Sequence, residues 1–256
     1  MIDEKLLTKL HAGDCLFGIS LRYNDAAIIE TIGPGWDFCW IDLQHGAIQP
    51  DRVLEIVRAC AITGTAPFIR LGRQSQDLLG FALDLAVAGV IVAQVDTVEH
   101  AAAAVAAAKF PPLGDRSFGG RRICDRHGTD YVLHANQRQL LLVQMESPLA
   151  LENCEKIAAL DGVDGLMIGP DDMAIRLGIP RSSPLEGPVG EATRRIATAA
   201  RGQGKVAMGF GGAAEKDIRA AVTLGLNMIS MGADVSFLRQ GMAAWTGAVR
   251  TYKENQ

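Results

Sequence analysis

The sequence has no surplus of positive charge. Its 25 lysines and arginines are outnumbered by 29 aspartates and glutamates, which gives a formal net charge of −4. A nucleic-acid-binding surface needs clustered positive charge, so we expect no nucleic-acid partner. No apolar run reaches the roughly 18 residues that are needed to cross a bilayer, so no membrane partner is expected either.

The five cysteines lack any pattern of pairing. Cys15, Cys39 and Cys60 lie in apolar runs and are interpreted as buried thiols. No CxxC or Cys/His cluster predicts a zinc site or a disulfide framework. The N-terminal segment MIDEKLLTKLHAG is amphipathic and charged, unlike a secretory signal peptide. We therefore expect a cytoplasmic protein.

What the sequence does contain is a regular alternation of short β-rich segments with Ala-rich amphipathic segments. We predict eight strands, at residues 16–21, 38–43, 67–71, 89–94, 140–145, 165–168, 206–209 and 228–231. Helical patterns lie between most of them, at residues 51–62, 76–88, 98–108, 147–160, 191–203 and 215–224. Strands that alternate with helices predict a parallel sheet.

Eight such units in 256 residues match the closed (β/α)₈ barrel of the TIM type. The alternative is an open doubly wound sheet, which the lack of a GxGxxG motif after the first strand disfavours. No linker or break in composition is present, so residues 1–256 are expected to form a single domain. The long connections at residues 111–136 and 178–190 are expected to be functional or mobile loops.

The C-terminal segment, residues 235–252, is predicted to form a final helix. Its apolar residues lie on or near one stripe: Phe237, Leu238, Met242, Trp245 and Val249. Such a stripe packs either on the protein's own barrel or on a neighbouring subunit.

Two acids follow neighbouring predicted strands in the stretch from residue 140 to 177. Glu146 follows LLLVQM, and Asp172 follows GLMIGPD. Because the carboxyl ends of parallel strands meet at one mouth of a barrel, the two carboxylates should converge. Hard divalent cations such as Mg²⁺ or Mn²⁺ prefer oxygen ligands of this kind. The alternative role of each acid is a helix cap, which fits Asp172 better than Glu146.

His45 and Arg70 end two further strands. Imidazole changes its protonation state near neutral pH, so His45 is the best candidate base, and Asp42 could hold its tautomer. The alternative is a histidine that hydrogen bonds satisfy at a strand end. Arg70 ends an apolar strand, where it would bind a substrate anion or form a structural ion pair with an acid.

The motif GPDDMA opens a helix, so free main-chain N–H groups at its start would bind an anion. The motif comprises Gly169, Pro170, Asp171 and Asp172 before Met173. A metal, an anion site and an arginine at one mouth describe a binding place for a small 2-keto acid.

These residues carry a resemblance to a known family. The motifs GWDFCWIDLQHG, PFIRL, AGVIVAQVDTVEHA, KFPPLGDRSFG, VQMESPLALEN and GVDGLMIGPDDMA occur in order along most of the chain. In these motifs the chain resembles the metal-dependent (class II) pyruvate or 2-keto-acid aldolases. That family includes 4-hydroxy-2-oxo-heptanedioate aldolase and 2-dehydro-3-deoxyglucarate aldolase.

The resemblance implies specific roles. Glu146 and Asp172 would bind a divalent metal, Mg²⁺ or Mn²⁺, with Co²⁺ or Zn²⁺ also compatible. His45 would be the base, Arg70 would stabilise an enolate oxygen, and Gln144 would lie in the substrate site. The main-chain N–H groups of the GPDD segment would bind the keto-acid carboxylate. The family also credits an aspartate at the position of Asp84 with raising the basicity of the histidine.

The resemblance further implies a homo-oligomer, a hexamer or trimer of dimers, in which the last helix packs on a neighbour. The chain departs from the family at Gln44, where a glutamate is usual, and Phe210 is expected to shape the pocket. Arg121 and Arg122 in the long loop would either select an acidic aldehyde or be solvated.

The expected function is a carbon–carbon lyase. It would reversibly cleave 4-hydroxy-2-keto acids to pyruvate, or a related 2-keto acid, and an aldehyde through a metal-bound enolate. The alternatives are an acyl-CoA lyase of the citrate lyase β type, an oxaloacetate decarboxylase, and a metal-free binding barrel without activity. No lysine lies at a strand end where a Schiff base would form, since Lys109 and Lys205 flank helices.

Overall fold

In the computed structural model, which describes residues 4–75, 77–181 and 183–256, eight parallel strands form a closed barrel. Neighbours in the barrel follow chain order, and the last strand pairs with the first. The predicted TIM-type barrel is confirmed, and the open doubly wound sheet is excluded. The strands are β1 (Leu16–Leu21), β2 (Phe38–Asp42), β3 (Ala66–Leu71), β4 (Gly89–Val92), β5 (Leu140–Met145), β6 (Gly165–Ile168), β7 (Val206–Phe210) and β8 (Met228–Ala233).

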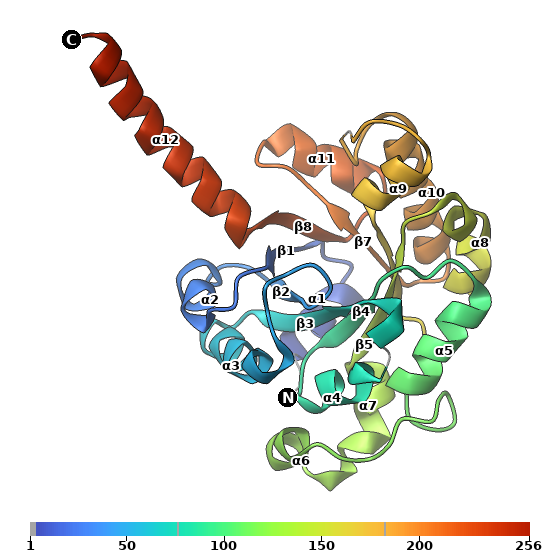
Figure 1. The fold of residues 1–256 in the computed structure, drawn as a ribbon. Coiled ribbons are helices and arrows are strands. Elements are labelled where there is room, and N and C mark those ends of the chain that lie inside the picture. The colour runs from blue at the N-terminus through green and yellow to red at the C-terminus, as the bar shows by residue number, and fades with distance from the viewer. Residues whose placement is uncertain (1–3, 76, 182) are drawn as a thin grey trace.

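Helices surround the barrel, as Figure 1 shows. They are α1 (Glu4–His11), α2 (Ala26–Ile32), α3 (Val53–Thr63), α4 (Leu78–Asp84), α5 (Val98–Ala108), α6 (Arg121–His127), α7 (Val132–Arg138), α8 (Pro148–Ala158), α9 (Pro170–Arg176), α10 (Gly187–Gly202), α11 (Glu215–Thr223) and α12 (Asp234–Glu254). The predicted start of α4 at Gln76 lies outside the described residues.

The connection at residues 111–136, which we expected to be a loop, contains α6 and most of α7. Each helix has only seven residues, too few for a clear periodic pattern in the sequence. Their stability comes instead from tertiary packing, since Ile123, Tyr131 and Ala135 bury their side chains with Phe110. The second connection is also shorter than predicted, because α10 begins at residue 187.

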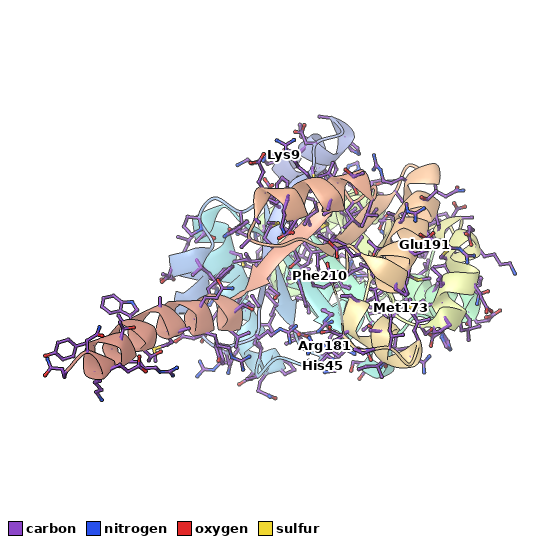
Figure 2. All side chains as sticks on the ribbon, turned by 90° about the horizontal axis from the view of Figure 1, so that it is seen from above. Lys9, His45, Met173, Arg181, Glu191 and Phe210 are labelled. Atoms are coloured by element: carbon purple, nitrogen blue, oxygen red, sulfur yellow. The ribbon has the colours of Figure 1, made fainter. Side chains whose placement is uncertain are left out.

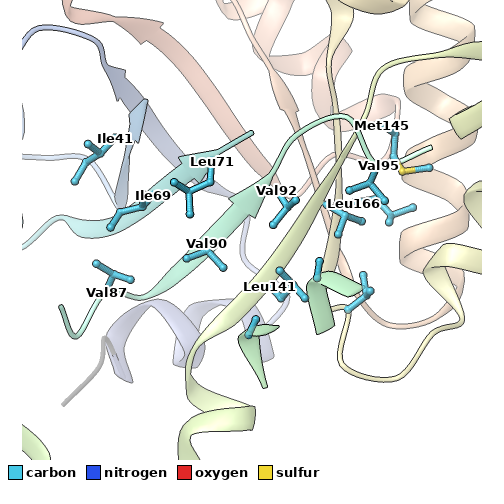
Figure 3. Close-up of a cluster of buried hydrophobic side chains, with 14 of the residues drawn as sticks. Ile41, Ile69, Leu71, Val87, Val90, Val92, Val95, Leu141, Met145 and Leu166 are labelled. Carbon is cyan, nitrogen blue, oxygen red and sulfur yellow. The ribbon is translucent and has the colours of Figure 1, made fainter. Parts of the chain in front are cut away.

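Side chains alternate between the two faces of the barrel wall. One face packs against the helices and forms the larger core, part of which is drawn in Figure 3 with Ile41, Ile69 and Val90. The other face fills the barrel interior with large side chains such as Trp40 and Phe68. Because successive side chains of a strand point to opposite faces, the interior positions recur at every second residue.

The interior is closed at the N-terminal ends of the strands by α1. Leu6, Leu7 and Leu10 of this helix pack against the interior cluster. The opposite mouth, at the C-terminal ends of the strands, is where polar side chains replace apolar ones at interior positions. A barrel of this type places its active site at that mouth.

The last helix, α12, projects away from the barrel (Figure 1). Of its predicted apolar stripe, only Phe237 packs against the core. Met242 is 62% exposed and Trp245 is 78% exposed, so the stripe does not cover the protein's own barrel. Within the described residues, no helix is both long and apolar enough to cross a membrane.

Lys109 is a buried structural residue at the N-terminal side of the barrel. Its Nζ donates to the carbonyl oxygens of Asn136 and Gln139, both at 2.9 Å, and to Asp164 Oδ2 at 2.6 Å. The side chain is only 2% exposed. The lysine therefore joins α7 to the segments that lead into β5 and β6.

We expect Lys109→Met to lower the free energy of unfolding by roughly 2 to 4 kcal/mol, because it leaves a carboxylate and two carbonyl groups without their donor. Denaturant unfolding measures this loss. Lys216→Met, at an exposed position of α11, is the matched control. Equal stabilities of the two variants would contradict the structural role of Lys109.

Candidate active site

The mouth is built on a buried ion pair between Asp42 and Arg70, which are register partners on β2 and β3. Arg70 Nε and Nη2 donate to the two carboxylate oxygens of Asp42 over 3.1 and 2.6 Å. The guanidinium also lies over the indole ring of Trp40, 4.7 Å from its centroid. The cation is thus held in one orientation by a bidentate hydrogen bond and by stacking.

Asp42 remains ionised in this buried place. Burial by itself raises the pKa of its carboxyl group, but hydrogen bonding and charge from Arg70, the His45 amide and the charge of Arg22 bring the net pKa below its usual value. Oδ1 also accepts the main-chain N–H groups of Gln44 and His45, each over 3.1 Å. Asp42 therefore orients Arg70 and the chain after β2. The sequence suggested that Asp42 could hold the imidazole of His45. Among the described residues, however, its carboxylate makes no hydrogen bond to that ring.

A chain of hydrogen bonds continues from Arg70 across the mouth. Arg70 Nη1 donates to Gln144 Oε1 at 3.2 Å, and Gln144 Nε2 donates to Glu146 Oε2 at 2.7 Å. Gln144 lies on β5, and Glu146 follows this strand at the next interior position. The same alternation that fills the barrel with apolar side chains thus brings these polar groups together at its end.

Glu146 is the site residue whose ionised form is least favourable in the fold. It is 2% exposed, and its Oε1 has no hydrogen-bond partner among the described residues. Burial, followed by the negative charge of Asp172, raises its pKa to about 7. Arg70, Arg176 and the N–H of Gln94 act in the opposite direction but do not compensate. The buried carboxylate of Glu146 therefore lies beside the carboxylate of Asp172 without enough positive charge nearby to balance the two.

The space around Glu146 depends on Gly169. A Cβ atom at this position would lie 2.3 Å from Glu146 Oε2 and 2.7 Å from Gln144 Nε2, so any other residue would displace them. Pro170 then opens α9, whose first turn carries Asp171 and Asp172. The first turn of a helix leaves main-chain N–H groups without intrahelical partners, and this turn follows closely on β6.

Glu146 and Asp172 fit a divalent cation. The unpaired oxygen of Glu146 and the electrostatic effect of Asp172 on it are both features that a bound cation would relieve. The described residues contain no group of three or more His, Cys, Asp or Glu side chains placed to hold a metal. Two carboxylates alone suit Mg²⁺ or Mn²⁺, which commonly complete their coordination with water and substrate oxygens.

Asp171 contributes differently from its neighbour. Its carboxylate forms a bidentate ion pair with Arg181, with both contacts at 2.7 Å. Both side chains are exposed. Arg181 was not among the predicted site residues, because nothing in its local sequence distinguishes it from a solvated loop arginine.

His45 lies in the exposed segment after β2, and its ring has no hydrogen-bond partner among the described residues. Gly46 permits the tight course of this segment, since a Cβ atom there would lie 2.2 Å from the Asp42 carbonyl oxygen. Figure 2 shows His45 at the side of the barrel opposite Lys9, which belongs to α1. His45 is therefore at the mouth, with its ring open to a ligand.

Asp84 does not join this cluster within the chain. It ends α4, and its carboxylate accepts a hydrogen bond from Arg116 Nη2 at 2.8 Å. Arg116 in turn donates to Gln139, which precedes β5. These contacts place Asp84 toward the N-terminal ends of the strands, because α4 runs antiparallel to the strands it joins. The family-based role of Asp84 beside His45 is not formed inside one chain.

The remaining predicted residues are also placed. Phe210 ends β7 and packs edge-on against Trp40, with 6.4 Å between ring centroids. Arg121 is 89% exposed and pairs with Asp125 on its own helix, so within the chain it is a solvated residue. Arg122 Nε donates to the Leu85 carbonyl oxygen at 3.0 Å.

Two residues after β4 that the sequence analysis did not select also lie close to the predicted site residues. Gln94 has a left-handed backbone, with φ of 59°, and its main-chain N–H lowers the pKa of Glu146. Asp96 accepts from Ser147 Oγ at 2.5 Å and lies 3.7 Å from Arg73 and 3.6 Å from Arg176. Polar residues at positions 94 and 96, directly after a strand, were the available signal.

Comparisons with known proteins agree with this geometry. The family described as HpcH/HpaI aldolase/citrate lyase matches residues 18–240. A hydroxypyruvate/pyruvate aldolase of Delftia acidovorans is 32% identical over 245 residues, which cover 94% of this chain and 90% of the relative. A 2-keto-3-deoxy-L-rhamnonate aldolase of Klebsiella pneumoniae is 31% identical over 237 residues, covering 90% and 87%.

Among solved structures, an HpcH/HpaI aldolase/citrate lyase family protein from Burkholderia cenocepacia superimposes with a TM-score of 0.86. It shares 28% sequence identity, and the match covers 96% of this chain and 99% of the other. The likeness therefore extends over the whole barrel.

The raised pKa of Glu146 has a consequence for stability. The pKa of Glu146 is about 7 in the folded protein, above the ordinary value of 4.5. Between these two pH values the folded protein keeps a proton that the unfolded chain has lost, so the fold becomes less stable as the pH rises through this range. In a chelating buffer we expect Glu146→Gln to be more stable than the parent by roughly 3 kcal/mol above pH 7. This gain should shrink as the pH falls below 7 and vanish below about 4.5.

Chemical unfolding at pH 5 and pH 8 measures this difference. Glu254→Gln, at the exposed end of α12, is the matched control and should follow the parent protein at both pH values. Parallel pH profiles for Glu146→Gln and the parent would show that the carboxylate is not destabilised in the fold.

Proposed function

Because the chain belongs to the HpcH/HpaI aldolase/citrate lyase family, we propose that it is a divalent-metal-dependent aldolase. It reversibly cleaves 4-hydroxy-2-keto acids to pyruvate, or a related 2-keto acid, and an aldehyde. The relatives at 31% and 32% identity are both named aldolases, which favours this reaction over acyl-CoA cleavage. The enzyme is accordingly a carbon–carbon lyase.

The observation that carries the proposal is the hydrogen-bonded chain from Asp42 through Arg70 and Gln144 to Glu146, with Asp172 beside its end. One end of this series of hydrogen bonds presents the guanidinium of Arg70, and the other end presents the carboxylates of Glu146 and Asp172. Cleavage of a 2-keto acid would use both, because its carbonyl oxygen becomes negative beside Arg70 and the carboxylates would hold the cation that polarises it.

Glu146 and Asp172 would hold the divalent cation, which supplies Lewis acidity toward the keto oxygen. Arg70 faces the same oxygen and stabilises the negative charge that develops on it. The side chain of Gln144 positions both neighbours: its oxygen accepts from the guanidinium of Arg70, and its nitrogen donates to Glu146. The main-chain N–H groups that follow Gly169 bind the carboxylate of the keto acid.

His45 moves the proton. In the cleavage direction its imidazole accepts the proton of the C4 hydroxyl group, and the C3–C4 electron pair becomes the C2–C3 double bond of an enolate. C4 becomes the carbonyl carbon of the aldehyde, which departs from C3. Protonation of C3 then gives the 2-keto acid, and the proton held by His45 balances this step. Condensation follows the same steps in reverse.

The route through a lysine Schiff base has no residue to support it. Lys109 is bound by three acceptors at the opposite end of the barrel, and Lys205 Nζ donates to the Leu160 carbonyl oxygen just before β7. Neither amine reaches the mouth.

We expect His45→Ala to lower kcat for pyruvate release by at least about 100-fold, because the reaction loses its general base. Complete removal of divalent metal from the parent enzyme should abolish turnover, and Mg²⁺ or Mn²⁺ should restore it. A coupled assay of pyruvate released from a 4-hydroxy-2-keto acid measures both effects.

His134→Ala, at an exposed position of α7, is the control for the loss of a histidine and should retain parental activity. Full activity after complete metal removal would refute the metal-dependent mechanism. Normal turnover of His45→Ala would refute the assignment of the base.

We also propose that the protein forms a homo-oligomer through α12, as a hexamer or trimer of dimers. Five apolar residues at helical spacing are exposed on this projecting helix: Leu238, Met242, Trp245, Val249 and Tyr252. An exposed apolar face of this length is typical of an interface.

We therefore expect the double variant Met242→Asp/Trp245→Asp to form smaller particles than the parent, because burial of two charges at the interface is unfavourable. Size-exclusion chromatography with light scattering measures the masses. Gln240→Asp, at an exposed position on the opposite face of the helix, is the control. An unchanged mass for the double variant would exclude α12 from the interface.

A further inference from the structure

Arg22 lies at the mouth, where its charge helps to lower the pKa of Asp42, but it has no role toward the substrate in the mechanism above. On β1, Leu16 and Gly18 face the barrel interior, where Leu16 joins the interior cluster and Gly18 abuts Phe38. Ser20 and Arg22 are the next positions in this alternation. Arg22 therefore follows the strand at a position that is directed over the mouth.

The backbone of Arg22 is fixed on both sides. Its N–H donates to both carboxylate oxygens of Asp234 at 3.1 Å, and its carbonyl oxygen accepts the N–H of Ala47 at 2.8 Å. Asp234 is 1% exposed and begins α12, whereas Ala47 follows His45. The base of the Arg22 side chain is thus held between β8 and the segment that carries His45.

Among the described residues, the only ion-pair partner of the Arg22 guanidinium is Asp42. Nε is buried without a hydrogen bond among the described residues, and its nearest carboxylate oxygen is Asp42 Oδ2 at 3.9 Å. That oxygen already accepts from Arg70 at 2.6 Å. One carboxylate thus faces two guanidinium groups, and Gln44, the next interior position, is neutral. Nε of Arg22 thus has no carboxylate oxygen within hydrogen-bonding distance.

The position of the Arg22 guanidinium indicates which half of the substrate it would contact. The carboxylate of the keto acid belongs to the segment after β6, which is separated from β1 by β7 and β8. His45, which handles the hydroxyl group on the aldehyde carbon, follows β2, the direct neighbour of β1. The Arg22 side chain is 39% exposed, so its guanidinium is accessible from solvent. Arg22 therefore borders the aldehyde half.

We propose that Arg22 is a specificity-determining residue that binds an anionic oxygen group, such as a carboxylate, on the aldehyde half of the substrate. The inference rests on the proposed aldolase function and narrows its substrate class to acidic aldehydes. Arg22 supplies a charge-assisted hydrogen bond that a neutral aldehyde cannot accept with equal strength.

The test compares acidic aldehydes with their neutral amides as acceptors for pyruvate in the presence of Mn²⁺. Glyoxylate and 4-oxobutanoate are paired with glyoxylamide and 4-oxobutanamide, which covers two chain lengths. The parent enzyme should prefer at least one acid over its amide in kcat/KM. Arg22→Gln should lower kcat/KM for that acid by about 10- to 100-fold, mainly through KM.

The same variant should change kcat/KM for the amides by no more than about threefold, which also shows that it is folded and competent. Arg22→Lys should keep part of the preference, because it retains the charge but not the guanidinium geometry. Arg219→Gln, which removes an exposed arginine of α11, is the matched control and should keep the parental ratio.

The outcomes separate the two levels of the proposal. If the parent enzyme condenses pyruvate with none of the four acceptors, the aldolase function itself fails. If the parent turns over amides but prefers neither acid, the assignment of Arg22 fails. A loss in Arg22→Gln that is equal for acids and amides would likewise overturn it, because it would show a structural role through Asp42.

Discussion

A guanidinium group buried at the end of a barrel strand has to be neutralised and held on every side, and Arg70 sets this constraint for the whole mouth. Asp42 takes two of its donors, Gln144 takes a third, and Trp40 covers its face. Each partner comes from β2 or β5, so one cation fixes the relative positions of strands from different parts of the barrel. The site is rigid because these contacts depend on one another.

The opposite end of this chain of hydrogen bonds is left uncompensated. Glu146 and Asp172 place negative charge in a buried place, and the guanidinium of Arg70 reaches them only through Gln144. A site that is satisfied at one end and electrostatically unfavourable at the other is arranged to receive a cation. The buried carboxylate of Glu146 lowers the stability of the fold at the mouth, and the packed core of the barrel offsets this loss.

Much of this arrangement could be predicted from the sequence, since each predicted strand coincides with an observed strand to within two residues at either end. Asp42, Arg70, Gln144 and Glu146 are joined by hydrogen bonds because parallel strands bring their carboxyl ends to one mouth. The role of Asp42 was not predictable. Its spacing from His45 fits an imidazole partner, but its carboxylate accepts the main-chain N–H of His45 and the guanidinium of Arg70. Sequence spacing does not reveal which hydrogen-bond donor is nearest.

The sequence by itself determined the barrel, the family and the main polar residues at the strand ends, because periodicity and motif order are properties of the chain alone. Only the tertiary structure decided how these residues are paired. Within one chain Asp84 pairs with Arg116 and not with His45, and Arg22 lies 3.9 Å from Asp42 although it follows β1. Pairing depends on register and burial, which are set between strands that are distant in sequence.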